Sequence, residues 1–164
     1  MKLLREILYK VEINSVIGNT SLSINKIEFD SRLISDGDMY IAITGVNVDG
    51  HSFISQAIQN GANCIVCEKI PENKTDGVVY VNVKSSRKAL AIISSNYFDN
   101  PSSKLNLIGV TGTNGKTTIA TLLFDLYTEL EIKSGLISTV KISYDNKNFQ
   151  AYQTTPDSLS INRF

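Results

Sequence analysis

The stretch LNLIGVTGTNGKTT, Leu105–Thr118, decides the fold expected for this chain. Its first part, Leu105–Val110, is mostly apolar and predicts a short buried strand. A turn rich in Thr, Gly and Asn follows, and a helical pattern begins at Lys116. A glycine-rich turn between a strand and a helix is a setting in which backbone N–H groups and a helix N-terminus bind phosphate. The stretch therefore predicts a nucleotide-binding loop.

The loop residues have separate expected roles. Glycines allow backbone conformations that direct successive N–H groups at phosphate oxygens. Lys116 is expected to reach the β- and γ-phosphates of ATP and to act as the catalytic residue by stabilising charge on the transferred group. The Thr117 hydroxyl is the expected Mg²⁺ ligand. The predicted ATP-binding set is Gly112, Thr113, Asn114, Gly115, Lys116, Thr117 and Thr118.

The glycine spacing departs from the general phosphate-loop pattern. With Gly115-Lys116-Thr117 aligned, that pattern requires glycine at position 110, where this chain has Val110. The variant TGTNGKT resembles the ATP loop of the Mur ligases, which add amino acids to the UDP-linked precursor of peptidoglycan. Folylpolyglutamate synthetases have a similar loop. A glycine-rich turn with a chance Gly-Lys-Thr is the alternative interpretation.

Composition limits the possible classes of protein. The chain has 164 residues, 42% hydrophobic and 20% charged, which is typical of a soluble globular protein. Its formal net charge is zero, so electrostatics give no reason to expect nucleic acid or an anionic membrane as a partner. It has no apolar run of membrane-spanning length, and its N-terminus lacks the apolar segment of a signal peptide. We therefore expect a cytoplasmic protein.

The two cysteines form a Cys-x-x-Cys pair, Cys64 and Cys67. A closed zinc site would need further ligands, and the chain has no second cysteine pair and one histidine. Both cysteines lie in an apolar run that predicts a buried strand, on which their side chains point to opposite faces. They are expected to be core thiols.

The chain alternates predicted strands and helices, which indicates an α/β fold with a largely parallel sheet. Strands are predicted over residues 24–29, 39–43, 64–68, 78–83 and 136–137, with a hairpin around 145–146; helices are predicted near 3–11, 51–60, 85–97, 116–130 and from 158 onward. In the fourth helix the residues expected to face inward are Ile119, Leu122, Leu123, Leu126 and Leu130.

A linker around Pro101 divides the chain into residues 1–100 and residues 101–164. The second part has room for only about two βα units, too few to cover both faces of a parallel sheet. We therefore expect a small N-terminal α/β domain followed by the incomplete beginning of a central ATP-binding domain with a parallel sheet. The chain is expected to be an N-terminal fragment of a longer protein.

A second stretch, FDSR followed by GDMYIA, resembles the D-S-R…G-D-x-F/Y-x-A signature in the first domain of two Mur ligases. These are the ligase that adds the third peptide residue and the ligase that adds the terminal dipeptide. In the former this region holds the uridine end of the substrate, so the resemblance implies that Phe29 and Ser31 bind it. The alternative is that Asp30 and Arg32 form a surface ion pair at a turn.

The loop TGVNVDGH resembles the family's G-x-x-x-D-G-H/R stretch, whose middle residues line the UDP pocket. The resemblance implies substrate contacts for Val46, Asn47 and Val48. His51 is interpreted as a residue at the start of a helix and is given no catalytic role.

The stretch YQTTPD resembles the T-T-P-D of the third-residue ligase, where the Thr pair binds the sugar-peptide substrate near the γ-phosphate. The resemblance implies substrate contacts for Gln153, Thr154 and Thr155. A Thr/Pro turn in which Asp157 caps the following helix is the alternative.

Together the matches imply a ligase that uses ATP and Mg²⁺ to add a diamino acid, meso-diaminopimelate or L-lysine, to UDP-N-acetylmuramoyl-L-alanyl-D-glutamate through an acyl phosphate. The family's remaining catalytic residues and its amino-acid site would lie beyond Phe164, so these residues alone are expected to be inactive. The alternatives are the dipeptide-adding ligase, a folylpolyglutamate-type ligase or small kinase, and a non-catalytic module that binds a UDP-sugar.

Overall fold

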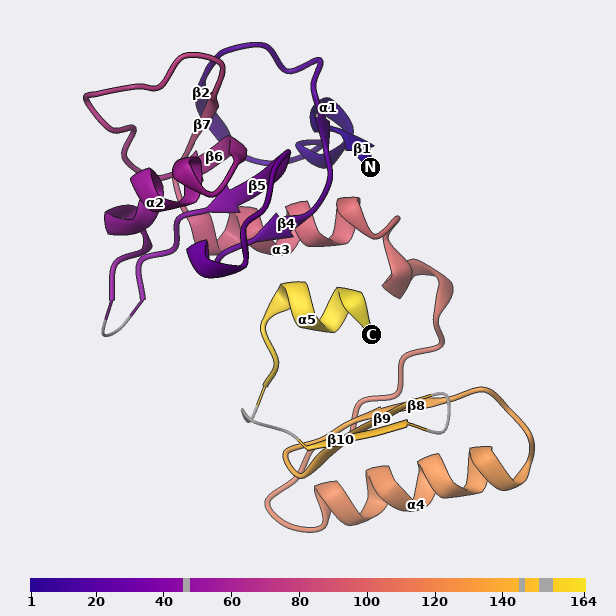
Figure 1. The fold of residues 1–164 in the computed structure, drawn as a ribbon. Helices are drawn as coiled ribbons and strands as arrows, with labels where there is room; N and C mark the ends of the chain where they lie inside the picture. The colour runs from indigo at the N-terminus through magenta and orange to yellow at the C-terminus, as the bar shows by residue number, and fades with distance from the viewer. Residues whose placement is uncertain (46–47, 145–146, 151–154) are drawn as a thin grey trace. The chain divides into compact units, whose positions relative to one another are not determined.

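The computed structural model describes residues 1–45, 48–144, 147–150 and 155–164. The chain divides into two compact units, Met1–Pro101 (unit 1) and Ser102–Phe164 (unit 2), as Figure 1 shows. Each unit combines helices with its own sheet, so the predicted α/β class is confirmed. The ligand-binding roles expected for the two parts of the chain stay predictions.

Unit 1 is built on a five-stranded sheet with the order β2-β7-β6-β5-β4. The strands are β2 (Ile13–Ile17), β4 (Ile27–Glu28), β5 (Asp38–Ile41), β6 (Ala62–Cys67) and β7 (Val79–Val83). Strands β4 to β7 are parallel, and β2 joins β7 antiparallel at the edge. The carboxyl ends of four strands therefore meet at one edge, where α/β proteins bind ligands. A small separate ladder joins β1 (Lys2–Leu3) to β3 (Ser23–Ile24).

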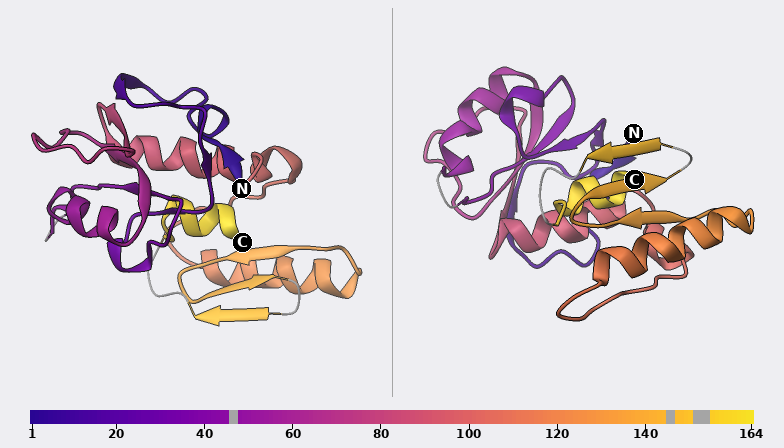
Figure 2. Two further views of the ribbon diagram at one scale, coloured as in Figure 1. Left: turned by 45° about the horizontal axis from the view of Figure 1, so that its top comes forward. Right: turned by 90° about the horizontal axis from the view of Figure 1, so that it is seen from below.

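Helices cover both faces of this sheet, and Figure 2 shows α2 and α3 on opposite sides of it. On one face α2 (Ile54–Gln59) packs in a buried cluster with strand residues that include Tyr40, Ile65 and Tyr80. Alternation along the strands directs their neighbours, among them Met39 and Val66, to the other face, where they are fully buried. The helices α1 (Leu4–Ile7) and α3 (Ser86–Tyr97) pack against each other.

The helix boundaries follow local signals. Ser85, one of two adjacent serines that could cap this helix, caps α3 by accepting a hydrogen bond from the Lys88 N–H at 3.4 Å. Gly61 ends α2 with a φ of 108°, a conformation that favours glycine. A Cβ at this position would also lie 2.6 Å from the Asp36 Cα.

Several predicted elements of unit 1 form with changed bounds. The strand predicted over residues 24–29 is two short strands, β3 and β4, that pair in different sheets. The first helix covers only Leu4–Ile7, and the helix predicted from residue 51 begins as a 3-10 turn, η2 (Gly50–Phe53). Strand β2 was not predicted from the sequence, because its residues lack the alternation of apolar and polar side chains that marks a half-buried strand. In the structure all five of its residues are exposed.

Unit 2 contains η3 (Pro101–Lys104, which begins at the last residue of unit 1), α4 (Lys116–Glu129), α5 (Ser158–Arg163) and a three-stranded sheet. The strands β8 (Gly135–Ile137), β9 (Lys141–Tyr144) and β10 (Lys147–Gln150) run antiparallel in the order β10-β9-β8. The predicted hairpin is confirmed by the β9–β10 pairing, although its tip, residues 145–146, lies outside the described residues. The parallel strands of the described chain thus lie in unit 1, and the sheet of unit 2 is antiparallel.

Two predictions for unit 2 are wrong. Residues Leu105–Val110 form no strand, and Leu107 is 89% exposed. The apolar face of α4 is also exposed: its inward-facing assignment fails at Ile119, Leu122, Leu126 and Leu130, whereas Leu123 is partly buried. A strand needs a partner for its backbone N–H and C=O groups, and none pairs with residues 105–110 in the part of the chain that the structure describes.

Candidate substrate and nucleotide sites

The Asp30-Ser31-Arg32 stretch forms a 3-10 turn, η1 (Ser31–Leu33), directly after β4. The Asp30 carboxylate caps the turn by accepting from the Arg32 N–H at 3.0 Å. It also accepts from two guanidinium nitrogens of Arg32, Nε at 2.9 Å and Nη2 at 2.7 Å. These hydrogen bonds hold the pKa of Asp30 below its ordinary value. The ion pair that the sequence left as an alternative is therefore present.

Ser31 is buried against α2. Its hydroxyl donates to Gln56 Oε1 at 2.8 Å, and its carbonyl oxygen accepts from Asn60 Nδ2 at 2.8 Å. A serine hydroxyl that donates to the protein keeps lone pairs with which to accept a hydrogen bond. Phe29, the other substrate residue predicted in this stretch, is partly exposed.

The loop from Thr44 to Gly50, which we call the substrate loop, closes on itself at its base. Thr44 and Asp49 form an isolated antiparallel bridge, and the Gly45 N–H donates to the Val48 carbonyl at 2.9 Å. Val48, a predicted substrate contact, is 58% exposed. The predicted contacts Val46 and Asn47 lie outside the described residues.

Tyr40 of β5 holds the end of the substrate loop. Its ring is buried, and its hydroxyl donates to the Gly50 carbonyl at 2.9 Å. Burial raises the pKa of Tyr40 to about 12, and the nearby charges of Asp30 and Asp49 add to the effect. The Tyr40 phenol therefore contacts the end of the substrate loop, and the charge of Asp30, in the other predicted substrate stretch, adds to the rise in its pKa. The sequence comparison included Tyr40 only as part of a motif and missed this role.

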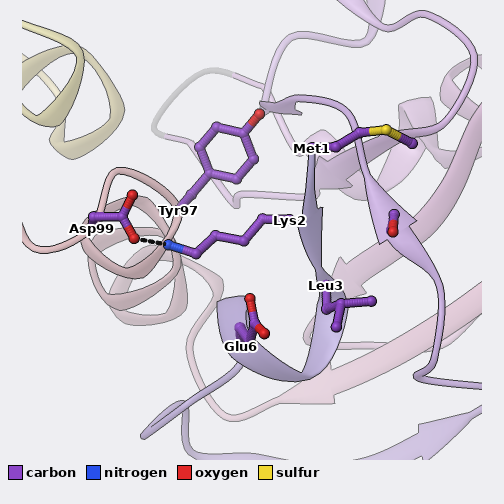
Figure 3. Close-up of a pocket in the computed structure, with 7 residues that line it drawn as sticks. Met1, Lys2, Leu3, Glu6, Tyr97 and Asp99 are labelled. Carbon is purple, nitrogen blue, oxygen red and sulfur yellow. Dashed lines mark hydrogen bonds and ion pairs between the residues drawn. The ribbon is translucent and has the colours of Figure 1, made fainter.

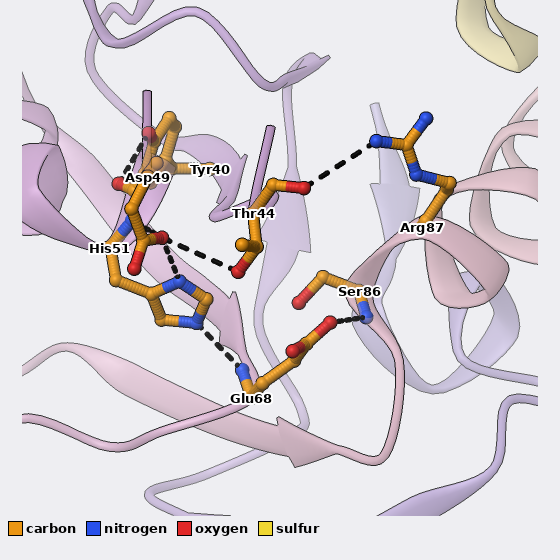
Figure 4. Close-up of polar contacts among 8 residues, drawn as sticks. Tyr40, Thr44, Asp49, His51, Glu68, Ser86 and Arg87 are labelled. Carbon is orange, nitrogen blue, oxygen red and sulfur yellow. Dashed lines mark hydrogen bonds and ion pairs between the residues drawn. The ribbon is translucent and has the colours of Figure 1, made fainter. Parts of the chain in front are cut away.

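His51 ties the end of the substrate loop to β6 (Figure 4). The Glu68 N–H donates to His51 Nε2 at 2.9 Å, so Nε2 carries no proton. Nδ1 therefore carries the proton and donates to Asp49 Oδ1 at 2.7 Å. Asp49 also accepts from the His51 backbone N–H, and these bonds hold the pKa of Asp49 below its ordinary value. His51 has a structural role, as a neutral imidazole.

In unit 2 the predicted phosphate loop leads directly into α4. Gly112 and Gly115 have φ values of 151° and 78°, which favour glycine, and Gly115 is the N-cap of the helix. The Lys116 ammonium donates to the carbonyls of Gly112 at 2.5 Å and Thr113 at 3.2 Å. The lysine head therefore lies over the loop that leads into this 14-residue helix.

The residues around this loop fit a bound nucleotide with Mg²⁺. A Cβ built on Gly112 or Gly115 would meet nothing nearer than 3.6 Å, so the space beside the loop is open. The Thr117 hydroxyl lies 3.5 Å from that of Thr139. The described residues include no cluster of three or more Asp, Glu, His or Cys side chains that could hold a metal ion. Mg²⁺ bound through one hydroxyl, phosphate oxygens and water suits this arrangement.

The last predicted substrate residues lie between β10 and α5. Gln153 and Thr154 lie outside the described residues, and Thr155 is exposed. Asp157 caps α5 by accepting from the Ser160 N–H at 2.9 Å, so the capping alternative holds for this residue. The predicted sites fall in different units.

Other candidate features belong to neither site. Cys64 and Cys67 are free and buried, which confirms the prediction of core thiols. A cavity of about 520 Å³ lies between the N-terminal residues and the end of α3 (Figure 3). Lys2, which lines this cavity, forms an ion pair with Asp99. None of the predicted site residues is among the residues that line it. No helix in the described ranges is long and apolar enough to span a membrane.

Comparison with protein families matches two models to this chain. The Mur ligase family catalytic domain matches residues 23–98, and the Mur ligase middle domain matches residues 110–164. Together they include the substrate loop, the phosphate loop and the TTPD stretch.

Curated relatives are similar along almost the whole chain. The UDP-N-acetylmuramoyl-L-alanyl-D-glutamate--2,6-diaminopimelate ligase of Cytophaga hutchinsonii is 49% identical over 161 residues, which is 98% of this chain and 33% of the relative. The ligase of the same name from Clostridium tetani is 44% identical over 162 residues, again 98% of this chain and 33% of the relative. The chain thus spans about a third of the length of these relatives.

Solved structures show the same fold. A UDP-N-acetylmuramoyl-L-alanyl-D-glutamate--2,6-diaminopimelate ligase superposes with a TM-score of 0.72 at 22% identity, over 99% of this chain and 32% of that one. The MurF ligase of Thermotoga maritima, solved in complex with ADP, has a TM-score of 0.54 at 29% identity, over 84% of this chain and 28% of that one.

Proposed function

Because this chain belongs to the Mur ligase family, we propose that it serves the ATP-dependent ligation of 2,6-diaminopimelate to UDP-N-acetylmuramoyl-L-alanyl-D-glutamate. The relatives named for this reaction are 49% and 44% identical to it. Their names favour diaminopimelate over L-lysine, two acceptors that the sequence alone left open. The cytoplasm remains the proposed compartment.

The proposal divides the work between the units. Unit 1 would bind the uridine diphosphate end of the substrate with Phe29, Ser31 and the substrate loop. Unit 2 would bind ATP with residues 112–118, and Gln153, Thr154 and Thr155 would contact the sugar-peptide. The single observation that carries the proposal is the 49% identity, over 98% of this chain, to a ligase named for this reaction.

The chain's own groups would act on ATP by position and charge. ATP supplies the phosphoryl group that turns a carboxylate into an acyl donor. The loop N–H groups and the α4 N-terminus would orient the phosphates, and the Lys116 ammonium would stabilise their charge. Lys116 now donates to two loop carbonyls, so it would exchange these for phosphate oxygens on binding. Thr117 would hold Mg²⁺.

Calorimetric titration with UDP-N-acetylmuramoyl-L-alanyl-D-glutamate tests the proposal. We expect saturable binding that Phe29→Ala and the double substitution of Thr154 and Thr155 by Ala weaken. Ser52→Ala is the matched control, because Ser52 is exposed and lies just outside the substrate loop. Absence of binding to a chain shown to be folded by circular dichroism would contradict the assignment of the substrate site to these residues.

A further inference from the structure

Among its described residues, the substrate loop is held at its base by several hydrogen bonds. They include the Thr44–Asp49 bridge, a 2.9 Å bond from the Gly45 N–H to the Val48 carbonyl, and a 2.9 Å bond from the Gly50 N–H to the Ile43 carbonyl; the Tyr40 hydroxyl adds a bond to the Gly50 carbonyl. A binding loop that must be ordered when ligand arrives loses affinity, so a fixed loop binds better than a loose one. Residues that fix the loop therefore affect the affinity of the site for its ligand.

Glu68 is a rigid point beside the loop. It follows β6, and its carbonyl oxygen accepts from Asn82 Nδ2 of β7 at 2.9 Å. Its carboxylate accepts from the Ser86 N–H at 2.9 Å, at the first turn of α3. A carboxylate at a helix N-terminus is favourable because it meets the positive end of the helix dipole. Glu68 is thus held by a strand and a helix at once.

The loop is attached to this point through His51 (Figure 4). One ring nitrogen donates to Asp49, inside the loop, and the other accepts from the Glu68 N–H. A second and longer link runs from Arg87 Nη2 to the Thr44 carbonyl at 3.4 Å. Both links join the base of the loop to the end of β6 and the start of α3.

We propose that His51 and Glu68 are positioning residues that hold the base of the substrate loop, at Thr44 and Asp49, in place for ligand binding without contacting the ligand. This rests on the proposed function, in which the loop binds the uridine diphosphate end of the substrate. Glu68 is the fixed end of the link and His51 is the connector. The connector needs one donor and one acceptor on opposite sides, which a neutral imidazole supplies.

Three substitutions at position 51 separate the two contacts. His51→Phe keeps a ring of similar size and removes both. His51→Asn keeps a group that reaches Asp49 but is too short to reach the Glu68 N–H. His51→Gln has an amide with both a donor and an acceptor at greater reach, and should restore part of the link. Ser52→Ala is the control.

Amide hydrogen exchange on the 164-residue chain tests the positioning role without a ligand. In His51→Phe and His51→Asn we expect protection of the Gly45 and Gly50 amides to fall about tenfold, the size of one lost hydrogen bond worth about 1.4 kcal/mol. Protection in β6 should stay unchanged, and His51→Gln should lie between. Unchanged loop protection, or an equal loss in loop and β6, would overturn the proposal. If His51→Phe does not fold, His51→Asn decides it.

Titration with UDP-N-acetylmuramoyl-L-alanyl-D-glutamate separates failure of this inference from failure of the proposed function. Binding by the wild type that His51→Phe weakens about tenfold supports both. Equal binding by the wild type and His51→Phe overturns the positioning role. If the folded wild type does not bind, the proposed function of the loop fails, and hydrogen exchange still decides whether His51 holds it.

Discussion

The Ser31 hydroxyl donates a 2.8 Å hydrogen bond to Gln56 Oε1, which ties the turn after β4 to the middle of α2. Sequence comparison assigned this serine to the substrate, and in the structure its hydroxyl proton is already used within the protein. While this bond is kept, a ligand can engage the Ser31 hydroxyl only by donating to it. This distinguishes the N–H of a uracil ring, which can donate, from phosphate oxygens, which cannot.

Ser31→Ala should lower the free energy of unfolding by about 1 kcal/mol, because it removes the buried hydroxyl and its bond to Gln56, whose exposed side chain can turn to water instead. Urea denaturation followed by circular dichroism measures this. Ser52→Ala, at an exposed position, should change it by less than about 0.5 kcal/mol. Equal stability of Ser31→Ala and Ser52→Ala would show that the Gln56 bond contributes nothing.

Gly50→Ala should destabilise unit 1 by about 1–3 kcal/mol, since a Cβ there would lie 2.7 Å from the Ile43 nitrogen and 2.8 Å from its carbonyl oxygen. The shift would also disturb the Gly50 carbonyl that Tyr40 binds. Thermal unfolding is the measurement. Gly77→Ala is the control: Gly77 has a φ of 81° but open space around it, so it carries a backbone cost alone. A smaller loss at Gly50 than at Gly77 would contradict the predicted clash.

Lys116→Ala should weaken binding of ATP with Mg²⁺ by about tenfold or more, because a charge-assisted contact to phosphate contributes about 1.5–3 kcal/mol. The helical signal should be unchanged, because the contacts of the lysine side chain among the described residues are with exposed loop carbonyls. Titration of both proteins with ATP and Mg²⁺ checks this. Lys104→Ala, at another exposed lysine of unit 2, should bind as the wild type does. Undiminished binding by Lys116→Ala would contradict the nucleotide-site assignment.

The buried thiols predict a loss of stability at alkaline pH. Burial raises the pKa of Cys67 from 9.0 to about 11, and it also raises the pKa of Cys64. A group whose pKa is raised on folding stabilises the native state fully below its unfolded pKa, and this contribution is lost as pH rises toward the folded value. We therefore expect stability to decline from about pH 9 to about pH 11.

A thiol reagent at pH 8 measures the same burial. The native chain should react slowly, and both cysteines should react at once in concentrated guanidinium chloride. The double substitution of Cys64 and Cys67 by Ala should reduce the loss of stability at alkaline pH. The pKa of Tyr40 is also raised, so this residue would cause part of the loss that remains. Fast reaction of a native thiol at pH 8 would contradict core burial.

The elements that the sequence predicted well depend on local signals. Strands β6 and β7 appear as short apolar runs, and helices α3 and α4 begin at a capping serine and a glycine loop. Residues Leu105–Val110 form an equally clear apolar run, but the predicted strand is absent, because a buried strand requires a partner from elsewhere in the chain. Edge strand β2 was missed for the opposite reason, since its pairing with β7 needs no apolar alternation.

The phosphate loop shows what the sequence by itself determined. Glycines at positions whose φ is positive, and Lys and Thr at the first turn of a helix, follow from the conformational limits of the residues themselves. The helix cap at Ser85 is of the same kind. Backbone sterics and hydrogen bonds over three or four residues act alike in any fold.

Only the tertiary structure decided how the substrate stretches of unit 1 are connected. Tyr40 reaches the Gly50 carbonyl, and His51 reaches the Glu68 N–H, 17 residues along the chain. Neither contact has a signature in the spacing of residues, because each exists only where parallel strands bring their carboxyl ends to one edge. The physical reason is that a hydrogen bond of 2.9 Å depends on where folding places two groups, and sequence separation does not specify that position.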